Sequence, residues 1–357
     1  MSNLYVHFPF CRRKCAYCAL HSRCGASASA RDAYVVRLAD RLARFLRASS
    51  APLSTVYFGG GSPALCTLTP LFAELKNRLA TDAEFTVELH PLDVTDELLR
   101  QLADGGVNRI SMGVQSLDDA TLADMGRGYT AAEAARAFAK ARGRFENAGV
   151  DLIVGYPGDP PVRIATLKDW GLAHASVYSL QLEEHTLLMN RVRSGAVSVP
   201  TDDATLDALR RIADDLAGLG LRRYEISNYA RKGRECRHNL AVWRGEDYFG
   251  LGEGASGRVG LRRTQDWLPS EPELPPGGDD GCRPSVAKVS PAEDELERTI
   301  FRLRTFEGLD AGRHPEWQPT LRRFVAEGLL ERKSSASCYC LTSRGREVCD
   351  SILAELV

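Results

Sequence analysis

The feature that most constrains the fold is a regular alternation of short β-rich runs and longer amphipathic runs through the first half of the sequence. Repeated strand and helix pairs of this kind are typical of a parallel sheet with helices packed outside it. We expect six strands, over residues 4–8, 55–58, 84–89, 108–114, 149–154 and 175–180. Helical patterns lie between or after them, at 31–46, 70–79, 96–103, from 117, from 131 and at 204–219.

Polar and backbone-permissive residues stand where the predicted strands end. Gly59-Gly60-Gly61 follows the second strand, Glu88 and His90 mark the end of the third, and Gly113 that of the fourth. The active face of a barrel-type α/β protein is built at the carboxyl ends of its strands. Because six units are fewer than the eight of a full barrel, we expect an open, partial (β/α)6 barrel.

Composition argues against several classes of protein. The 357 residues carry 46 Lys and Arg against 47 Asp and Glu, a formal net charge of -1, which is unlike a protein that coats nucleic acid or an anionic membrane. No run approaches the roughly 18 apolar residues of a membrane span, and residues 1–10 lack the pattern of a signal peptide. We therefore expect a cytoplasmic protein, in which clustered cysteines indicate a metal more often than a disulfide.

The chain divides by pattern into four parts. Residues 1–220 hold the barrel pattern, 221–267 form an extension rich in glycine and aromatic residues, and 268–290 are predicted to be a linker or flexible loop. Residues 291–357 have the helix, helix, hairpin, helix order of a winged-helix-like α+β domain. Winged helices often bind DNA, but this part carries ten Lys and Arg against twelve Asp and Glu, so no nucleic-acid partner is expected.

Three cysteines within eight residues are the strongest chemical signal. Cys11, Cys15 and Cys18 have the spacing Cys-x3-Cys-x2-Cys directly after the first predicted strand. Pro9 before them indicates a loop, and a loop can wrap three thiolates around one metal or cluster. The basic residues 12–14 between them favour the thiolate form that ligation needs.

Three interpretations of this spacing are open. An amphipathic helix also places residues i, i+4 and i+7 on one face, where cysteines would pack as small apolar groups. A structural zinc site with His21 or Cys24 as fourth ligand would make the chain a zinc-stabilised interaction protein. The third interpretation is a [4Fe–4S] cluster held by three thiolates, which leaves one iron with an open position for a substrate or cofactor.

In the third interpretation the motif resembles that of radical S-adenosylmethionine (SAM) enzymes. Further motifs are similar to one family over nearly the whole chain, that of the oxygen-independent coproporphyrinogen III oxidases and their haem-chaperone relatives. These motifs are Tyr5-Val6-His7-Phe8-Pro9-Phe10-Cys11, Phe58-Gly59-Gly60-Gly61-Ser62-Pro63, Ser111-Met112-Gly113-Val114-Gln115-Ser116, Gly126-Arg127, Asp151-Leu152-Ile153-Val154-Gly155, Tyr224-Glu225-Ile226-Ser227-Asn228 and His238-Asn239.

The resemblance implies a [4Fe–4S] cluster on the three cysteines, SAM on its open iron and a protein that donates electrons to the cluster. Contacts to this SAM are implied for Tyr5, Tyr17, Gly60, Gly61 and Glu88. The oxidase binds a second SAM, and the matching positions here are Gly61, Ser62, Gln115, Arg127 and Asp151. We therefore expect one bound SAM molecule, with two bound SAM molecules as the alternative.

Two departures favour the haem-chaperone branch over the oxidase branch. The oxidase motif continues to a fourth cysteine at the second position after Cys18, where this chain has Leu20, and Cys24 lies too far along to replace it. The oxidase also has an N-terminal extension before its first cysteine. We expect a protein that binds haem, or another porphyrin, and passes it to an acceptor protein. Oxidative decarboxylation of coproporphyrinogen III is the alternative.

His238 is the candidate haem contact. In the chaperones a His-Asn-x-x-Tyr-Trp segment is linked to haem binding, and a neutral imidazole is an ordinary haem ligand. The alternative is a hydrogen-bonded histidine that orients a loop. Val242 and Ser256 stand where the chaperones usually have Tyr and His, and His90 replaces a usual Asn, so the match is weaker at the haem site than at the cluster.

Overall fold

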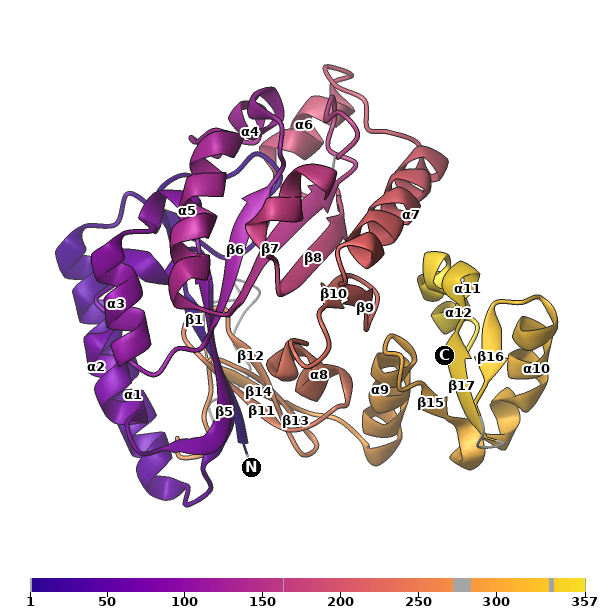
Figure 1. Ribbon diagram of the computed structural model, residues 1–357. Helices are drawn as coiled ribbons and strands as arrows, with labels where there is room; N and C mark the ends of the chain where they lie inside the picture. The colour runs from indigo at the N-terminus through magenta and orange to yellow at the C-terminus, as the bar shows by residue number, and fades with distance from the viewer. Residues whose placement is uncertain (1, 163, 272–283, 334–336, 357) are drawn as a thin grey trace.

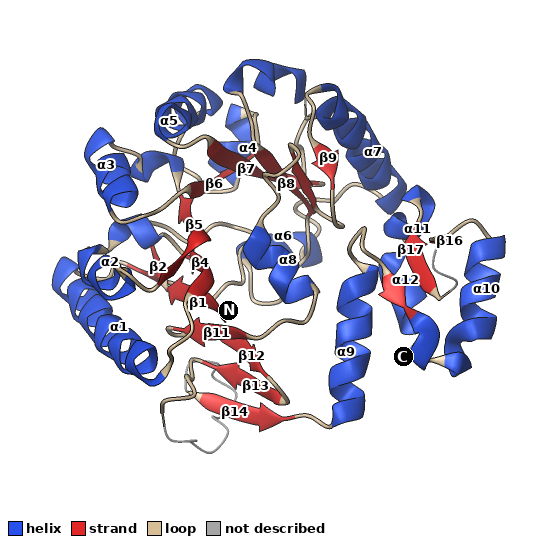
Figure 2. Ribbon diagram, turned by 60° about the horizontal axis from the view of Figure 1, so that its bottom comes forward, coloured by secondary structure: helices blue, strands red, loops and turns tan. Residues whose placement is uncertain are grey.

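The computed structural model describes residues 2–162, 164–271, 284–333 and 337–356. Its strands form a curved inner wall, and most helices pack outside that wall (Figures 1 and 2). Six neighbouring parallel strands follow one another in chain order, which confirms the predicted six-unit core. They are β1 (Ser2–Phe8), β4 (Leu53–Gly60), β5 (Leu79–Leu89), β6 (Arg109–Gln115), β7 (Asn147–Val154) and β8 (His174–Ser179).

The helices of the first half bury one apolar face against the outside of this wall. In α1 (Ala28–Ala48), Val35, Leu38 and Leu42 are at most 2% exposed. Ser27 begins the helix, since its side chain accepts a hydrogen bond from the N–H of Ala30. The other helices of this half are α2 (Thr69–Leu75), α3 (Asp96–Asp104), α4 (Asp119–Asp124), α5 (Ala131–Arg144), α6 (Leu187–Arg193) and α7 (Asp202–Gly218).

The helix predicted over 70–79 is shorter than expected, and the strand after it is longer. The α2 helix ends at Leu75, and Asn77 adopts a φ of 65°, a left-handed conformation that asparagine tolerates. Leu79 then begins β5, five residues before the predicted start at residue 84. Short 3-10 turns follow three of the barrel strands, at Pro63–Leu65, Pro91–Asp93 and Ile164–Trp170.

Side chains alternate along each strand, and the strand register divides the inside of the barrel into levels. In β1, Leu4 and Val6 are fully buried on the side of the helices, so Tyr5 and His7 point inward. The register places one inward residue of each next strand at the level of Tyr5: Tyr57, Thr86, Arg109 and Asn147. The inside of the barrel is therefore polar, although its outside is an apolar core.

The sheet extends beyond the six strands at both edges. On one side β11 (Tyr248–Leu251) pairs in parallel with β1, and β12 (Ser256–Val259), β13 (Arg262–Gln265) and β14 (Ser285–Lys288) follow in antiparallel order. On the other side lie β10 (Asn228–Ala230) and β9 (Arg222–Arg223). Within the described residues the two outermost strands do not pair, so the barrel is open.

The segment expected to be a linker, 268–290, contributes a strand to this sheet. β14 lies within it and pairs with β13, whereas residues 272–283 lie outside the described part of the chain. A strand was missed here because four residues of ordinary composition follow a run rich in proline and glycine.

Helix α8 (Arg237–Trp243) closes the amino-terminal end of the barrel. Figure 2 shows it in the middle of the ring of strands. Glu84, in the middle of β5, accepts hydrogen bonds from the backbone N–H groups of Arg237 and His238 at 3.0 and 3.1 Å. A carboxylate at this position satisfies donors that the first turn of a helix leaves free.

The C-terminal part has its own small core. It has the predicted order of helix, helix and hairpin, with a third short strand added, but the one closing helix that was predicted is two short helices divided at Val348. Leucines and aromatic residues fill the space between its elements. Its elements are α9 (Pro291–Leu303), β15 (Leu309–Asp310), α10 (Gln318–Ala326), β16 (Leu330–Arg332), β17 (Cys338–Leu341), α11 (Ser343–Glu347) and α12 (Cys349–Ala354), with 3-10 turns at Ala311–Arg313 and Pro315–Trp317.

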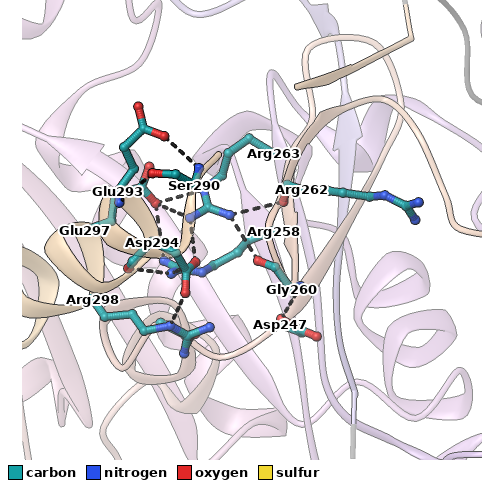
Figure 3. Close-up of polar contacts among 11 residues, drawn as sticks. Asp247, Arg258, Gly260, Arg262, Arg263, Ser290, Glu293, Asp294, Glu297 and Arg298 are labelled. Atoms are coloured by element: carbon teal, nitrogen blue, oxygen red, sulfur yellow. Dashed lines mark hydrogen bonds and ion pairs between the residues drawn. The ribbon is translucent and has the colours of Figure 1, made fainter. Parts of the chain in front are cut away.

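An ion-pair network joins α9 to the sheet extension (Figure 3). Arg258 of β12 is 1% exposed and pairs with Asp294 at 2.5 Å, and Arg298 pairs with the same carboxylate at 2.8 Å. Arg263 pairs with Glu297 at 2.6 Å. Burial raises the pKa of Asp294, but its arginine partners outweigh burial and lower the pKa to about 2.

None of the helices in the described part of the chain is long and apolar enough to cross a membrane.

Candidate functional site

The three motif cysteines lie on a loop at the carboxyl edge of the barrel strands. The loop leaves β1 through β2 (Phe10–Cys11), which pairs in parallel with β3 (Arg23–Cys24). Between these strands the described residues contain no helix, so the amphipathic-helix interpretation is wrong and the loop prediction is confirmed. The N–H of Cys18 donates to the carbonyl of Cys15 at 3.3 Å, which turns the chain back on itself.

The thiols do not form a ready metal site. Within the described residues, no group of three or more His, Cys, Asp or Glu side chains is close enough together to hold a metal ion. Burial is the main cause that raises the pKa of the Cys11 and Cys18 thiols. A single metal ion would therefore have to draw the three sulfurs together, whereas a cluster binds each thiolate on a different iron atom. Ligation of either kind requires the thiols to lose their protons. Because Cys24 is exposed on β3, the zinc set has no preformed geometry either.

The glycine turn after β4 packs directly on this loop. A Cβ added to Gly61 would lie 2.3 Å from the carbonyl oxygen of Phe10 and 2.8 Å from the sulfur of Cys11. Gly60 has a φ of 113°, and its Cβ would lie 2.7 Å from the ring of His7. Glycine is required at both positions by the packing of the turn on the chain around Cys11, in addition to any approach of a cofactor.

Glu88 is the acceptor at the centre of the first group of predicted SAM contacts. Its carboxylate accepts from the hydroxyl of Tyr57 at 2.8 Å and from the N–H of Gly60 at 3.1 Å. Burial raises its pKa to about 7, and the neighbouring Asp151 adds to the rise. Tyr5 lies beside Tyr57, with ring centroids 6.0 Å apart, and its hydroxyl is 2.9 Å from Nδ1 of His7.

Three members of the second predicted group gather around Gly113 of β6. Arg127 donates to the Gly113 carbonyl at 2.7 Å and to the sulfur of Cys15 at 3.3 Å. The amide nitrogen of Gln115 would lie 2.8 Å from a Cβ on Gly113, and Gln115 holds a φ of 71°, which is unusual for glutamine. Asp151 is the strand partner of Gly113, and burial raises its pKa.

Ser62 does not join this group, because its hydroxyl donates to Asp93 instead. Asp93 is 6% exposed and also accepts from Nε of Arg12 at 2.5 Å. Arg12 follows Cys11, so Asp93 ties the cysteine loop to the glycine turn. The sequence analysis missed Asp93, and the only signal for it was its position in the Pro91–Asp93 turn after a barrel strand.

Tyr17 and His90 lie against neighbouring aromatic rings. Tyr17 meets Tyr156 edge to face with centroids 6.3 Å apart. His90 meets Tyr129 in the same way at 5.1 Å, and its Nδ1 accepts from the N–H of Leu92. Burial and then the charge of Arg127 lower the pKa of His90 to about 3, so its imidazole is neutral.

His238 lies inside the barrel at the end opposite the cysteines. It is 4% exposed, its Nδ1 is 2.8 Å from the hydroxyl of Thr55, and its ring centroid is 5.3 Å from that of Tyr57. Thr55 and Gly61 are six residues apart, about 20 Å at 3.3 Å per residue of strand. Burial and then Arg109 lower the pKa of His238 to about 3. The structure thus places a neutral imidazole at the floor of the barrel, far from the cysteine loop.

Comparisons with known proteins show which proteins the chain is similar to. Residues 5–170 match the model of the Radical SAM superfamily. The chain is 36% identical to "Heme chaperone HemW" of Lactococcus lactis over 272 residues, 73% of this chain and 71% of that protein. It is 30% identical to "Heme chaperone HemW" of Bacillus subtilis over 100% of both chains. It is 35% identical to the mouse mitochondrial "Radical S-adenosyl methionine domain-containing protein 1" over 71% of this chain and 60% of that protein.

One solved structure has the same fold along almost the entire chain. Coproporphyrinogen III oxidase (HemN) of Escherichia coli superposes with a TM-score of 0.80 over 99% of this chain and 89% of its own, at 19% identity. This likeness shows the fold, a partial radical SAM barrel, and the curated relatives show the family.

Proposed function

The chain belongs to the heme chaperone family of radical SAM proteins, and from this premise we propose that it binds haem and passes it to an acceptor protein. The observation that carries the proposal is the likeness to the Bacillus subtilis heme chaperone, at 30% identity over 100% of both chains. The likeness to the oxidase structure, at 19% identity, supports the fold alone.

Membership of the radical SAM superfamily implies a [4Fe–4S] cluster and SAM, and the proposed cluster ligands are Cys11, Cys15 and Cys18. The donor set fits such a cluster, because three thiols share one loop and Gly61 leaves no side chain between the loop and the turn after β4. When bound and reduced, the cluster supplies one electron for the cleavage of SAM. Arg127 already contacts Cys15 and would hold that thiolate by its charge.

Two groups of residues around the cysteine loop are proposed to bind SAM. Glu88, at the end of β5, can accept hydrogen bonds from amine or hydroxyl groups of SAM once Tyr57 or Gly60 releases it. Arg127 and Asp151 can hold a carboxylate and an amine on the other side of Gly113. The two groups of residues bind either a single SAM molecule together or one SAM molecule each. The number of SAM molecules bound per chain in reconstituted protein separates the two arrangements.

The proposed haem contact is His238. Its imidazole is neutral, as a haem ligand must be, and within the described residues only Nδ1 has a hydrogen-bond partner. Because the residue is 4% exposed and sits on α8, haem can reach it only through the barrel or by movement of α8. The hydrogen bond between His238 and Thr55 joins α8 to β4, which supports the alternative of an orienting histidine.

The test is a haem titration followed by transfer. Anaerobically purified protein is titrated with haem, its Soret band is followed, and apomyoglobin is then added as an acceptor. We expect a saturable complex that yields its haem to apomyoglobin. His238→Ala should bind haem more weakly or with a shifted Soret band. The control is His185→Asn, because His185 is exposed and has a φ of 62° that asparagine tolerates.

Two results would contradict the proposal. The first is that the wild-type protein does not bind haem. The second is conversion of coproporphyrinogen III to protoporphyrinogen by the reconstituted protein under reducing, anaerobic conditions, which would assign the oxidase activity instead. If His238→Ala binds haem with unchanged affinity and spectrum, the chaperone proposal stands and His238 is excluded as the contact.

A further inference from the structure

Arg109 of β6 is a buried cation that the proposed function leaves without a role. Its side chain points into the barrel at the level of Tyr57 and Thr86, and the residue is 1% exposed. In the part of the chain that the structure describes, it forms no ion pair. Its one hydrogen bond, from Nη1 to the hydroxyl of Thr86, is 3.5 Å long, and its Nε has no partner.

The carboxylates around Arg109 are engaged elsewhere. Glu84 accepts the first N–H groups of α8 at 3.0 and 3.1 Å. Glu88 accepts the hydroxyl of Tyr57 at 2.8 Å, and Asp151 accepts a serine hydroxyl at 3.0 Å. These acids act on the guanidinium only through space. It therefore keeps donors that nothing in the described residues satisfies.

Two more buried polar atoms inside the barrel have no hydrogen-bond partner in the described residues. One lies at the level of Arg109, and the other lies one level above it, towards the carboxyl end of the strands. Asn147 is the strand partner of Arg109, and its Oδ1 has no hydrogen bond. His174, whose pKa Arg109 helps to lower after burial, has an unpartnered Nδ1. Buried polar atoms are nearly always satisfied by protein, water or ligand. Such a cluster at the floor of a barrel indicates that the missing partners come from outside the chain.

Several inward-pointing residues above this floor are partly exposed. Tyr57, Glu88 and Asp151 all point inward, yet each is only partly buried. Tyr178, one level above Asp151 on the neighbouring strand, is 42% exposed. Polar side chains that are partly exposed therefore line the barrel from Tyr178 down to Tyr57, which lies at the level of Arg109.

We infer that Arg109 is an anion site at the floor of the barrel and binds a carboxylate group of the molecule held in it. The inference rests on the proposed function, under which that group is a propionate of haem. A guanidinium is well suited to a carboxylate, since its planar fork can donate two parallel hydrogen bonds. His238 lies at the same floor, so a propionate on Arg109 would hold the macrocycle next to the proposed haem contact.

SAM offers the same chemistry through its methionine carboxylate, but apart from Tyr5, which shares the level of Arg109, its predicted contacts lie higher in the barrel. Gly113, which Arg127 contacts, is four residues from Arg109 along β6, about 13 Å. The propionate is therefore the assigned carboxylate, and the experiment separates the two sources.

The experiment compares haem with haem dimethyl ester, which keeps the macrocycle and loses both carboxylates. Dissociation constants for the two compounds are measured for the wild type, Arg109→Met, Arg109→Lys and a control, Arg136→Met, which removes an exposed charge from α5. The wild type should bind haem about 10- to 100-fold more tightly than the ester, the range expected for a charged hydrogen bond. Arg109→Met should abolish that preference, Arg109→Lys should keep part of it, and the control should keep all of it.

The comparison of haem with its dimethyl ester in the wild type needs no variant. It therefore tests whether a carboxylate of haem is bound even if Arg109→Met is unstable. Equal affinity of the wild type for haem and its ester overturns the inference and leaves the chaperone function intact. Failure of the wild type to bind either compound overturns the function and the inference together. If Arg109→Met loses affinity for SAM while its preference for haem over the ester persists, the carboxylate belongs to SAM and the propionate assignment is wrong.

Discussion

At the scale of single residues, the inside of the barrel combines acids and histidines whose protonation is set by burial. Glu88 and Asp151 both have a raised pKa, and each charge disfavours ionisation of the other residue. His174 and His238 have a lowered pKa and are neutral. The inside of the barrel therefore surrounds the buried guanidinium of Arg109 with neutral imidazoles and with acids whose ionisation burial opposes.

The raised pKa of Glu88 predicts how the stability of the protein depends on pH. Glu88 has a pKa of about 7 in the folded protein against an ordinary value of 4.5, so the folded state holds this proton more tightly than the unfolded state. Its contribution is favourable at acidic pH and is lost as pH rises towards 7. Glu88→Gln should be more stable than the wild type at pH 8 by at most about 3 kcal/mol, with a difference that shrinks towards pH 4.5.

Urea unfolding of both proteins at several pH values measures this difference. Asp151, Arg109 and Tyr57 face Glu88 and are unchanged in the variant, so the comparison isolates the one carboxyl. A difference in the free energy of unfolding that is constant between pH 4.5 and pH 8 would show that burial does not raise the pKa of Glu88.

The residue scale is also where the sequence was least informative. Arg12 was expected to favour thiolates by its charge, and the structure shows its side chain bound to Asp93 instead. The contact joins residues 81 positions apart, and no local pattern predicts which acid a given arginine meets. For the same reason the bond of Ser62 to Asp93 was not foreseen.

At the scale of elements, the turn after β4 and the strand β2 form one packed unit. The turn contributes glycines without Cβ atoms, and β2 contributes the carbonyl of Phe10 and the sulfur of Cys11. The motif of consecutive glycines was predicted to serve SAM. The structure adds that the cysteine loop cannot keep its position with any side chain at residue 61.

Gly61→Ala should therefore damage cluster binding. Its Cβ would lie 2.3 Å from a backbone oxygen, so β2 must move, at a cost of about 1–3 kcal/mol, typical of overpacking. The expected result is a large loss of iron and sulfide per chain after reconstitution, at a slightly lower melting temperature. Gly143→Ala is the matched control, because no other atom lies within 4 Å of its Cβ. Full iron content in Gly61→Ala would show that the turn does not hold the loop.

Strong periodic elements were predictable, and elements defined by distant partners were not. The six core strands and α7 follow from local pattern, and the cysteine loop from its position after β1. β14 was missed because its assignment depends on pairing with β13. The position of α8 inside the barrel could not be predicted, because Glu84 and Thr55, which hold it there, are about 150 and 180 positions earlier in the chain.

At the scale of the whole molecule, the barrel presents two ends to different parts of the chain. The carboxyl end carries the cysteine loop, and the amino end is closed by α8, which lies beside α9 of the C-terminal part. Trp243 of α8 packs edge to face on Phe301 of α9, with ring centroids 5.7 Å apart. Arg298 of α9, which belongs to the network of Figure 3, donates to the carbonyl of Gly245 just after α8 at 2.6 Å. The helix pair of α8 and α9 therefore lies beside the proposed haem contact, His238, which is part of α8.

The central claim is that Cys11, Cys15 and Cys18 hold a [4Fe–4S] cluster that takes SAM. The most direct measurement is electron paramagnetic resonance of the anaerobically reconstituted and reduced protein, recorded with and without SAM. We expect a [4Fe–4S] signal that changes shape when SAM is added and is absent in Cys15→Ala, with the signal retained in a variant of the exposed Cys24. A protein without a cluster signal, or with a signal that SAM leaves unchanged, would contradict the account.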